Sequence, residues 1–145
     1  MLLLHKFLEH YWAFWSSNIF MINVLFLCVE NSCRSQIAEA ICNNLFSTKI
    51  KGFSAGSNPA DKINSKALNS LLRVGIHHQG YPKSIDSFKN HELDIIVTMG
   101  CGDVCPFVPK IKKIEWQIPD PKFFESKKFD QVRDLIKSKI ISELL

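Results

Sequence analysis

The chain has 145 residues, of which 46% are hydrophobic and 22% charged, and its mean hydropathy is near zero. This length and composition fit one soluble globular domain with one core, and they exclude a disordered tail, a collagen and a membrane bundle. The net charge of +4 suits an anionic ligand but falls short of the basic surface typical of a nucleic-acid binder, so no nucleic-acid partner is predicted.

Residues 1–20 differ in composition from the rest of the chain. They hold six of the 16 aromatic residues but only one lysine and one glutamate. Charged side chains interrupt the early apolar run, and no stretch reaches the roughly 18 apolar residues of a membrane-spanning helix, so neither an export signal nor a transmembrane segment is predicted. Two interpretations remain: sequence upstream of a true start at Met21, which we favour, or a short amphipathic helix that docks on the domain or on a membrane surface. The folded domain is therefore predicted to span residues 21–145.

After residue 21, apolar spacing predicts strands that alternate with helices. A nearly continuous apolar run predicts a buried strand over residues 22–27. Apolar side chains at every fourth position up to Leu45 predict a helix after a polar loop. Further strands are expected over residues 50–54, 93–99 and 111–116, and a second helix between an N-cap at Asn64 and a stop at Gly75. A five-residue apolar stripe predicts the last helix: Phe129, Val132, Leu135, Ile136 and Ile140.

The alternation of strands and helices predicts an α/β fold, a single-domain, three-layer αβα arrangement with a four-stranded parallel sheet. Ligands of such sheets bind beyond the carboxyl ends of the strands. Functional residues are therefore expected in the loops at residues 28–34, 100–109 and 117–122. Four of the five cysteines fall in these loops.

The loop after the first predicted strand combines Cys28 at the strand end with Arg34 six residues later, where a helix begins. If its backbone N–H groups converge, the loop forms an anion-binding nest backed by the helix dipole, and the arginine fork can hold two oxygens of a tetrahedral oxyanion. The same field favours the nucleophilic thiolate form of Cys28, and Ser35 can donate a hydrogen bond to it. The residues expected to hold the oxyanion are Val29, Glu30, Asn31, Ser32, Cys33 and Arg34.

Taken singly, Cys28 is better interpreted as a buried strand-end residue and Arg34 as a solvated charge of the first helical turn. Their spacing between a strand and a helix favours the anion site over this interpretation. Cys42 falls on the apolar face of the first helix and is predicted to be a core residue. His77 and His78 lack metal-ligand spacing and are expected in a surface loop.

Residues 24–40 read VLFLCVENSCRSQIAEA. This run resembles the active-site loop of the low-molecular-weight protein tyrosine phosphatase superfamily, and within it most closely the thioredoxin-coupled arsenate reductases. The resemblance extends through residues 53–57 to Arg133 and Asp134, so it covers essentially all of residues 22–140. It implies a phosphatase-like catalytic domain in which Cys28 is the nucleophile and Arg34 binds the oxyanion.

A second pair of cysteines, Cys101 and Cys105, follows the third predicted strand and should lie at the same sheet edge as Cys28. Residues four apart in a helical turn have Cα atoms roughly 6 Å apart, within the range of a disulfide. Gly100 and Gly102 add backbone freedom there. A phosphatase needs neither cysteine. The resemblance implies a relay in which Cys101 displaces product from Cys28 and Cys105 then takes over the disulfide.

Asp120 precedes a proline in a polar loop, a pair that alone usually marks a turn. The resemblance implies that Asp120 protonates the leaving oxygen. The paired tyrosines common after this motif in tyrosine phosphatases are absent, which disfavours phosphotyrosine as the substrate. Some arsenate reductases of the family bind potassium through asparagine, glutamate and serine. The candidates here are Asn31, Glu39 and Ser54, and no metal ion is predicted.

The leading hypothesis is a cytoplasmic arsenate reductase with no bound cofactor, which external reduced thioredoxin or another low-molecular-weight thiol returns to the dithiol state. One alternative is a phosphatase that cleaves phosphate esters through a phospho-cysteine, for which the second cysteine pair is dispensable. Another is a non-catalytic redox or zinc-binding module in which four cysteines hold the metal: Cys28, Cys33, Cys101 and Cys105.

Overall fold

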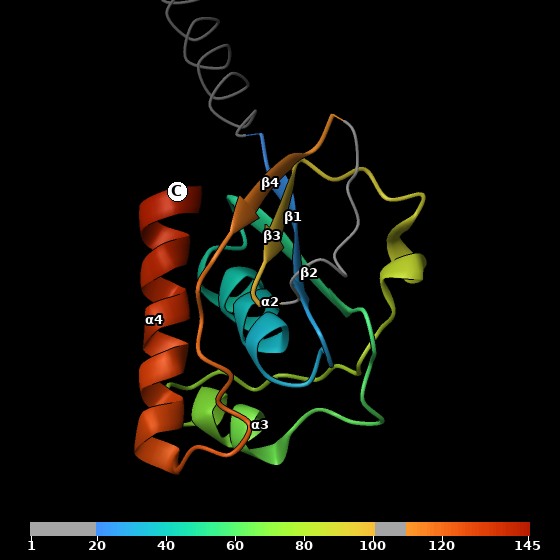
Figure 1. Cartoon of the computed structure of the whole chain (residues 1–145). Helices are drawn as coiled ribbons and strands as arrows, with labels where there is room; N and C mark the ends of the chain where they lie inside the picture. The colour runs from blue at the N-terminus through green and yellow to red at the C-terminus, as the bar shows by residue number, and fades with distance from the viewer. Residues whose placement is uncertain (1–19, 101–109) are drawn as a thin grey trace, which may run out of the picture.

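The computed structural model describes residues 20–100 and 110–145 (Figure 1). The predicted N-terminal extension lies outside these residues except for Phe20, as do Cys101 and Cys105. No helix in the described ranges is long and apolar enough to cross a membrane.

Strands and helices alternate along the chain as the apolar spacing predicts. Their order is β1 (Ile22–Cys28), α2 (Arg34–Leu45), β2 (Ile50–Gly56), α3 (Ser65–Leu72), the short 3-10 helix η1 (Ile85–Phe88), β3 (Ile95–Thr98), β4 (Lys112–Glu115) and α4 (Ser126–Leu144). The strand predictions are confirmed, with ends that move by one or two residues. The helix η1 was not predicted, because a single 3-10 turn is too short to give a periodic apolar signal.

The four strands form one all-parallel sheet in the order β2-β1-β3-β4, which confirms the predicted α/β fold. After β1 the chain passes to β2 on one side of the sheet, and after β3 it passes to β4 on the other side. The strand order therefore reverses between β1 and β3, and the loops that diverge there leave a crevice at the carboxyl edge. Leu27 at the end of β1 pairs with Thr98 at the end of β3, so both loops begin at this edge.

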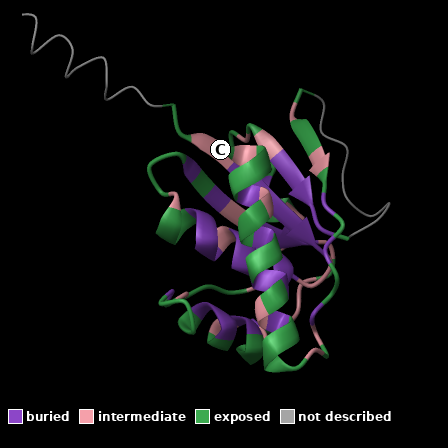
Figure 2. Cartoon of the chain, turned by 90° about the vertical axis from the view of Figure 1, so that its left-hand side faces the viewer, coloured by how far each residue is buried: buried purple, intermediate pink, exposed green. Residues whose placement is uncertain are grey.

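The helices α2, α3 and α4 pack against one another on one face of the sheet, and η1 lies on the other face (Figure 1). Alternate residues of β1 supply both cores, with Phe26 facing the helices and Leu27 facing Phe88 of η1. The buried sides of α2 and α4 face inward (Figure 2). This packing fixes the position of α2 against the end of β1, where the candidate site lies.

Two leucines of the predicted helix stripes are exposed rather than buried. Leu45 is 46% exposed because it is the last residue of α2, where the helix ends and the chain turns toward β2. Leu135 is 37% exposed because it lies off the row of α4 that packs into the core, a row formed by the other four residues of the stripe.

Candidate active site

A pocket of about 170 Å³ opens at the carboxyl edge of the sheet, where β1 ends. The loop between β1 and α2 forms most of its wall, and Asp120 closes it from a loop far along the chain. The lining residues are Cys28, Val29, Glu30, Ser32, Cys33, Arg34 and Asp120. The structure thus brings together the predicted thiol, arginine and carboxyl group, while Asn31 and Ser35 lie behind the wall and Cys101 and Cys105 lie outside the described residues.

The backbone of this loop turns its carbonyl groups away from the pocket. Four of these carbonyls accept hydrogen bonds of 2.8 to 3.3 Å from backbone amides of residues 57–64. In a planar trans peptide the C=O of one residue and the N–H of the following residue point in opposite directions. The loop N–H groups therefore face the pocket. Within the described part of the chain, the N–H groups of residues 29–33 have no hydrogen-bond acceptor. A ring of such donors at the start of α2 is a binding site for an anion.

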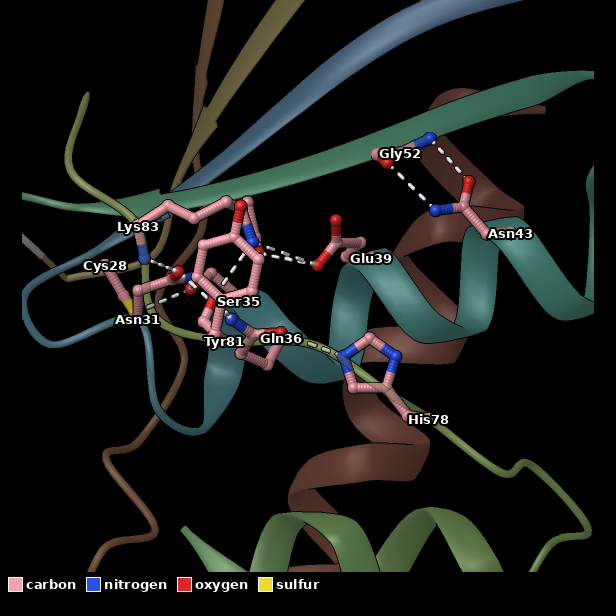
Figure 3. A network of polar contacts seen from close by, with 11 residues as sticks. Cys28, Asn31, Ser35, Gln36, Glu39, Asn43, Gly52, His78, Tyr81 and Lys83 are labelled. Carbon is pink, nitrogen blue, oxygen red and sulfur yellow. Dashed lines mark hydrogen bonds and ion pairs between the residues drawn. The ribbon is translucent and has the colours of Figure 1, made fainter. Parts of the chain in front are cut away.

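The hydrogen bonds behind Cys28 have a definite direction (Figure 3). The backbone N–H of Lys83 donates to the Asn31 Oδ1 at 2.8 Å, and this identifies the other side-chain atom of Asn31 as the Nδ2 donor. That Nδ2 donates to the Ser35 Oγ at 2.7 Å. The Ser35 hydroxyl proton is then free to point at the Cys28 Sγ, which lies 2.8 Å away. The Ser35 Oγ and the Cys28 Sγ are thus in hydrogen-bond contact, and the hydroxyl can donate to a thiolate at this position.

Two backbone features hold the loop in this shape. Asn31 has a positive φ of 52°, a conformation that asparagine tolerates better than most residues. Gly56 at the end of β2 lies so close to the loop that a Cβ there would come within 2.5 Å of the Val29 carbonyl oxygen. This role of Gly56 was not predicted, because only the register of β2 against β1 shows what Gly56 contacts.

Arg34 is held on three sides at the start of α2. It is 8% exposed, its Nη1 donates to the Ile118 carbonyl oxygen at 3.2 Å, and its Nη2 lies 3.8 Å from the Asp120 Oδ2. On the third side, a Cβ at Gly100 would come within 2.5 Å of the Nη1. Gly100 therefore gives the guanidinium its space, in addition to the backbone freedom that the sequence analysis assigned to it.

Replacement of Gly100 by alanine is expected to weaken oxyanion binding by about 10- to 100-fold, because the new methyl group displaces the guanidinium. Gly100 also has a positive φ of 101°, so the variant carries backbone strain. Gly75 is the matched control, since its φ is 78° and nothing lies within 4 Å of a Cβ placed there. Titration of inorganic phosphate by calorimetry should show the loss in Gly100→Ala and not in Gly75→Ala. Equal phosphate affinities in these two variants would contradict the assigned contact.

The second cysteine of the loop differs from Cys28 in its surroundings. Burial raises the pKa of the Cys33 thiol to about 11, with Asp120 and Cys28 adding to the effect. Cys33 is therefore a neutral thiol at physiological pH and not a competing nucleophile. The zinc alternative also requires Cys101 and Cys105, so the structure does not test it.

The three candidates for a potassium site already have protein partners, in two sets of contacts that Lys83 joins. The Ser54 hydroxyl donates to the Glu39 Oε2 at 2.8 Å. The Lys83 Nζ lies 3.8 Å from the same oxygen (Figure 3). Burial raises the pKa of Glu39, and Lys83 and Ser54 oppose that shift. Lys83 thus balances the charge of Glu39, whereas the Asn31 side chain bonds to Ser35, Gln36 and the Lys83 backbone. Within the described residues, no group of three His, Cys, Asp or Glu side chains could hold a metal ion.

His78 differs from the expectation of an ordinary surface-loop residue. It is half-buried, and its Nε2 lies 2.8 Å from the Gln36 Oε1. The Gln36 Nε2 donates to both Asn31 and the Tyr81 carbonyl oxygen, so the Oε1 is an acceptor and the His78 Nε2 carries the proton. Burial lowers the pKa of His78, and nearby Lys83 lowers it further. A neutral His78 thus supports the loop from behind, a role that spacing could not reveal.

The chain is similar to known proteins in both sequence and structure. The sequence matches the family described as low molecular weight phosphotyrosine protein phosphatase over residues 23–144. It is 35% identical over 124 residues to arsenate reductase 2 of Staphylococcus epidermidis, and the match covers 82% of this chain and 93% of that relative.

Two solved structures are similar as well. One is an arsenate reductase in the phosphate-binding state, with a TM-score of 0.74 and 28% identity, covering 83% of this chain and 95% of that chain. The other is a thioredoxin-dependent arsenate reductase of Corynebacterium glutamicum, with a TM-score of 0.65 and 34% identity, covering 85% of this chain and 64% of that chain.

Proposed function

The chain belongs to the low molecular weight phosphotyrosine protein phosphatase family, and on this basis we propose that it is an arsenate reductase, which converts arsenate to arsenite. The observation that carries the proposal is the 35% identity to an arsenate reductase over 82% of the chain. The pocket supports it, because a buried thiol, an arginine and a ring of backbone N–H groups suit a small tetrahedral oxyanion.

The first step joins the substrate to the protein. The Cys28 thiolate attacks arsenic, a sulfur–arsenic bond forms, and one arsenate oxygen leaves as water after Asp120 supplies a proton. The loop N–H groups and Arg34 stabilise the negative charge on the remaining oxygens. Asp120 is suitably placed for this role, since it lines the pocket and its side chain is 57% exposed, so solvent can return its proton.

The second step carries the two electrons. Cys101 attacks the Cys28 sulfur, a disulfide forms, and the sulfur–arsenic bond breaks, with its electron pair leaving on arsenic as arsenite. Cys105 then attacks Cys101, which releases Cys28 as a thiolate. An external dithiol such as reduced thioredoxin reduces the Cys101–Cys105 disulfide, and the similarity to a thioredoxin-dependent arsenate reductase supports that class of donor.

The proposal also covers where the protein works and where its folded part begins. The described cysteines Cys28, Cys33 and Cys42 are free thiols, a state that a reducing cytoplasm maintains. The first strand starts at Ile22, which supports a catalytic domain over residues 21–145 preceded by an extension over residues 1–20. Arsenate and a thioredoxin-like donor are the proposed partners.

A phosphatase would use the same pocket, so the deciding test must separate the two reactions. The reduced protein is incubated with arsenate, thioredoxin, thioredoxin reductase and NADPH, and in parallel with an aryl phosphate ester. Sustained NADPH consumption that requires arsenate and stops in Cys101→Ser is expected. Ester cleavage at the same rate in both proteins, without arsenate-dependent NADPH consumption, would overturn the proposal in favour of a phosphatase.

A further inference from the structure

Glu30 brings a negative charge to a pocket that is otherwise suited to an anion. Glu30 is one of the lining residues, together with Cys28, Arg34 and Asp120, and its side chain is 37% exposed. A carboxylate carried by a wall residue repels an oxyanion bound in the pocket, because each negative charge disfavours the other. The structure must therefore contain a group that offsets this charge.

Lys122 is that group. Its Nζ lies 2.8 Å from the Glu30 Oε1, and the Ser32 hydroxyl donates to the Glu30 Oε2 at 3.4 Å, so both carboxylate oxygens have partners. The hydrogen bond from Lys122 lowers the pKa of Glu30, and the same contact raises the pKa of Lys122. Both side chains are therefore fully charged at neutral pH.

The position of Lys122 also joins the two walls of the pocket. Its backbone N–H donates to the Asp120 Oδ1 at 3.1 Å, and the Asp120 Oδ2 faces Arg34. The ion pair thus bridges the loop after β1, which supplies Glu30, and the loop that supplies Asp120. Neither the apolar pattern nor the cysteine spacing predicts a charged residue at position 122. The ion pair with Glu30 therefore gives Lys122 a role that the sequence pattern does not indicate.

We propose that Lys122 is a positioning residue of the oxyanion pocket, which neutralises the Glu30 carboxylate and keeps it directed away from the bound oxyanion. This inference rests on the proposed function in one respect, that the pocket binds a tetrahedral oxyanion. It does not depend on arsenate reduction, because the charge of Glu30 affects the binding step.

Inorganic phosphate is the probe, titrated by calorimetry into the reduced full-length protein. In Lys122→Met the carboxylate loses its counter-ion, and phosphate affinity should fall about tenfold, a modest effect because both side chains are partly exposed. Lys122→Arg should stay within about twofold of the unaltered protein, since it keeps the charge and the reach. The double variant Glu30→Gln/Lys122→Met should recover the affinity, because the uncompensated charge is gone.

Lys127→Met is the matched control, since Lys127 is an exposed lysine in the first turn of α4 and forms no ion pair with a described residue. It removes the same net charge, so it corrects for long-range attraction. The inference is overturned if Lys122→Met binds phosphate as tightly as Lys127→Met, if the double variant binds as weakly as Lys122→Met, or if the unaltered protein binds no phosphate. The two proposals can fail separately. If the variants show the expected phosphate affinities but the unaltered protein does not reduce arsenate, the proposed function is overturned and this inference stands.

Discussion

Replacement of Cys28 by serine is expected to lower the rate of arsenate reduction at least about a thousandfold, the scale seen when a catalytic nucleophile is removed. A serine hydroxyl is a far weaker acid and a weaker nucleophile than a cysteine thiol, and the Ser35 hydroxyl is within hydrogen-bond distance of the Cys28 Sγ, where it can donate to a thiolate. Arsenite production under saturating thioredoxin measures the loss. The loop amides and Arg34 remain in place, so Cys28→Ser should still bind inorganic phosphate.

Cys42 provides the control for a general loss of thiols. It is fully buried in α2, and burial raises the pKa of its thiol to about 12, so it is inert at neutral pH. Cys42→Ala should reduce arsenate at close to the unaltered rate, with a stability cost of about 1 kcal/mol for the small cavity. Substantial arsenate reduction by Cys28→Ser would mean that another group is the nucleophile.

The local part of the site could be predicted because it lies within eight consecutive residues. A strand, a loop and a helix start follow one another there, so spacing alone places Cys28 beside the start of α2 and Ser35 within reach of it. The sheet was predictable for a similar reason, since each strand is a short apolar run between polar segments. The order β2-β1-β3-β4 then fixes which loops share an edge.

The long-range contacts of the site could not be predicted from local pattern. Lys122 is one lysine among many in the sequence, and only the fold shows that it contacts Glu30. Likewise, a glycine after a strand is common, and only the packing shows that Gly100 makes room for Arg34. Asp120 was found through the family resemblance, because an Asp-Pro pair alone indicates no more than a turn. The roles of Cys101 and Cys105 stay predictions, since both residues lie outside the described ranges.

Replacement of Cys105 by serine is expected to limit the protein to a single turnover with thioredoxin as the only reductant. Reduction of arsenate to arsenite takes two electrons, which the oxidation of two thiols to one disulfide supplies, so Cys28 and Cys101 suffice for the first arsenite. The product is then a Cys28–Cys101 disulfide. Cys28 is only 3% exposed at the base of a small pocket, so a protein reductant cannot approach its sulfur. Without Cys105 the oxidising equivalents stay in the Cys28–Cys101 disulfide, whose Cys28 half is out of reach of a protein reductant.

The measurement counts arsenite and lost thiols per protein molecule. Unaltered protein without reductant should release at most one arsenite and lose two thiols, and thioredoxin should restore turnover. Cys105→Ser should give the same first arsenite and then stop, whereas Cys101→Ser should release none and keep arsenic bound to Cys28. Several turnovers by Cys105→Ser with thioredoxin alone would rule out the third cysteine of the relay. In that case thioredoxin must attack the Cys101 sulfur directly, because the burial of Cys28 protects the other half of that disulfide.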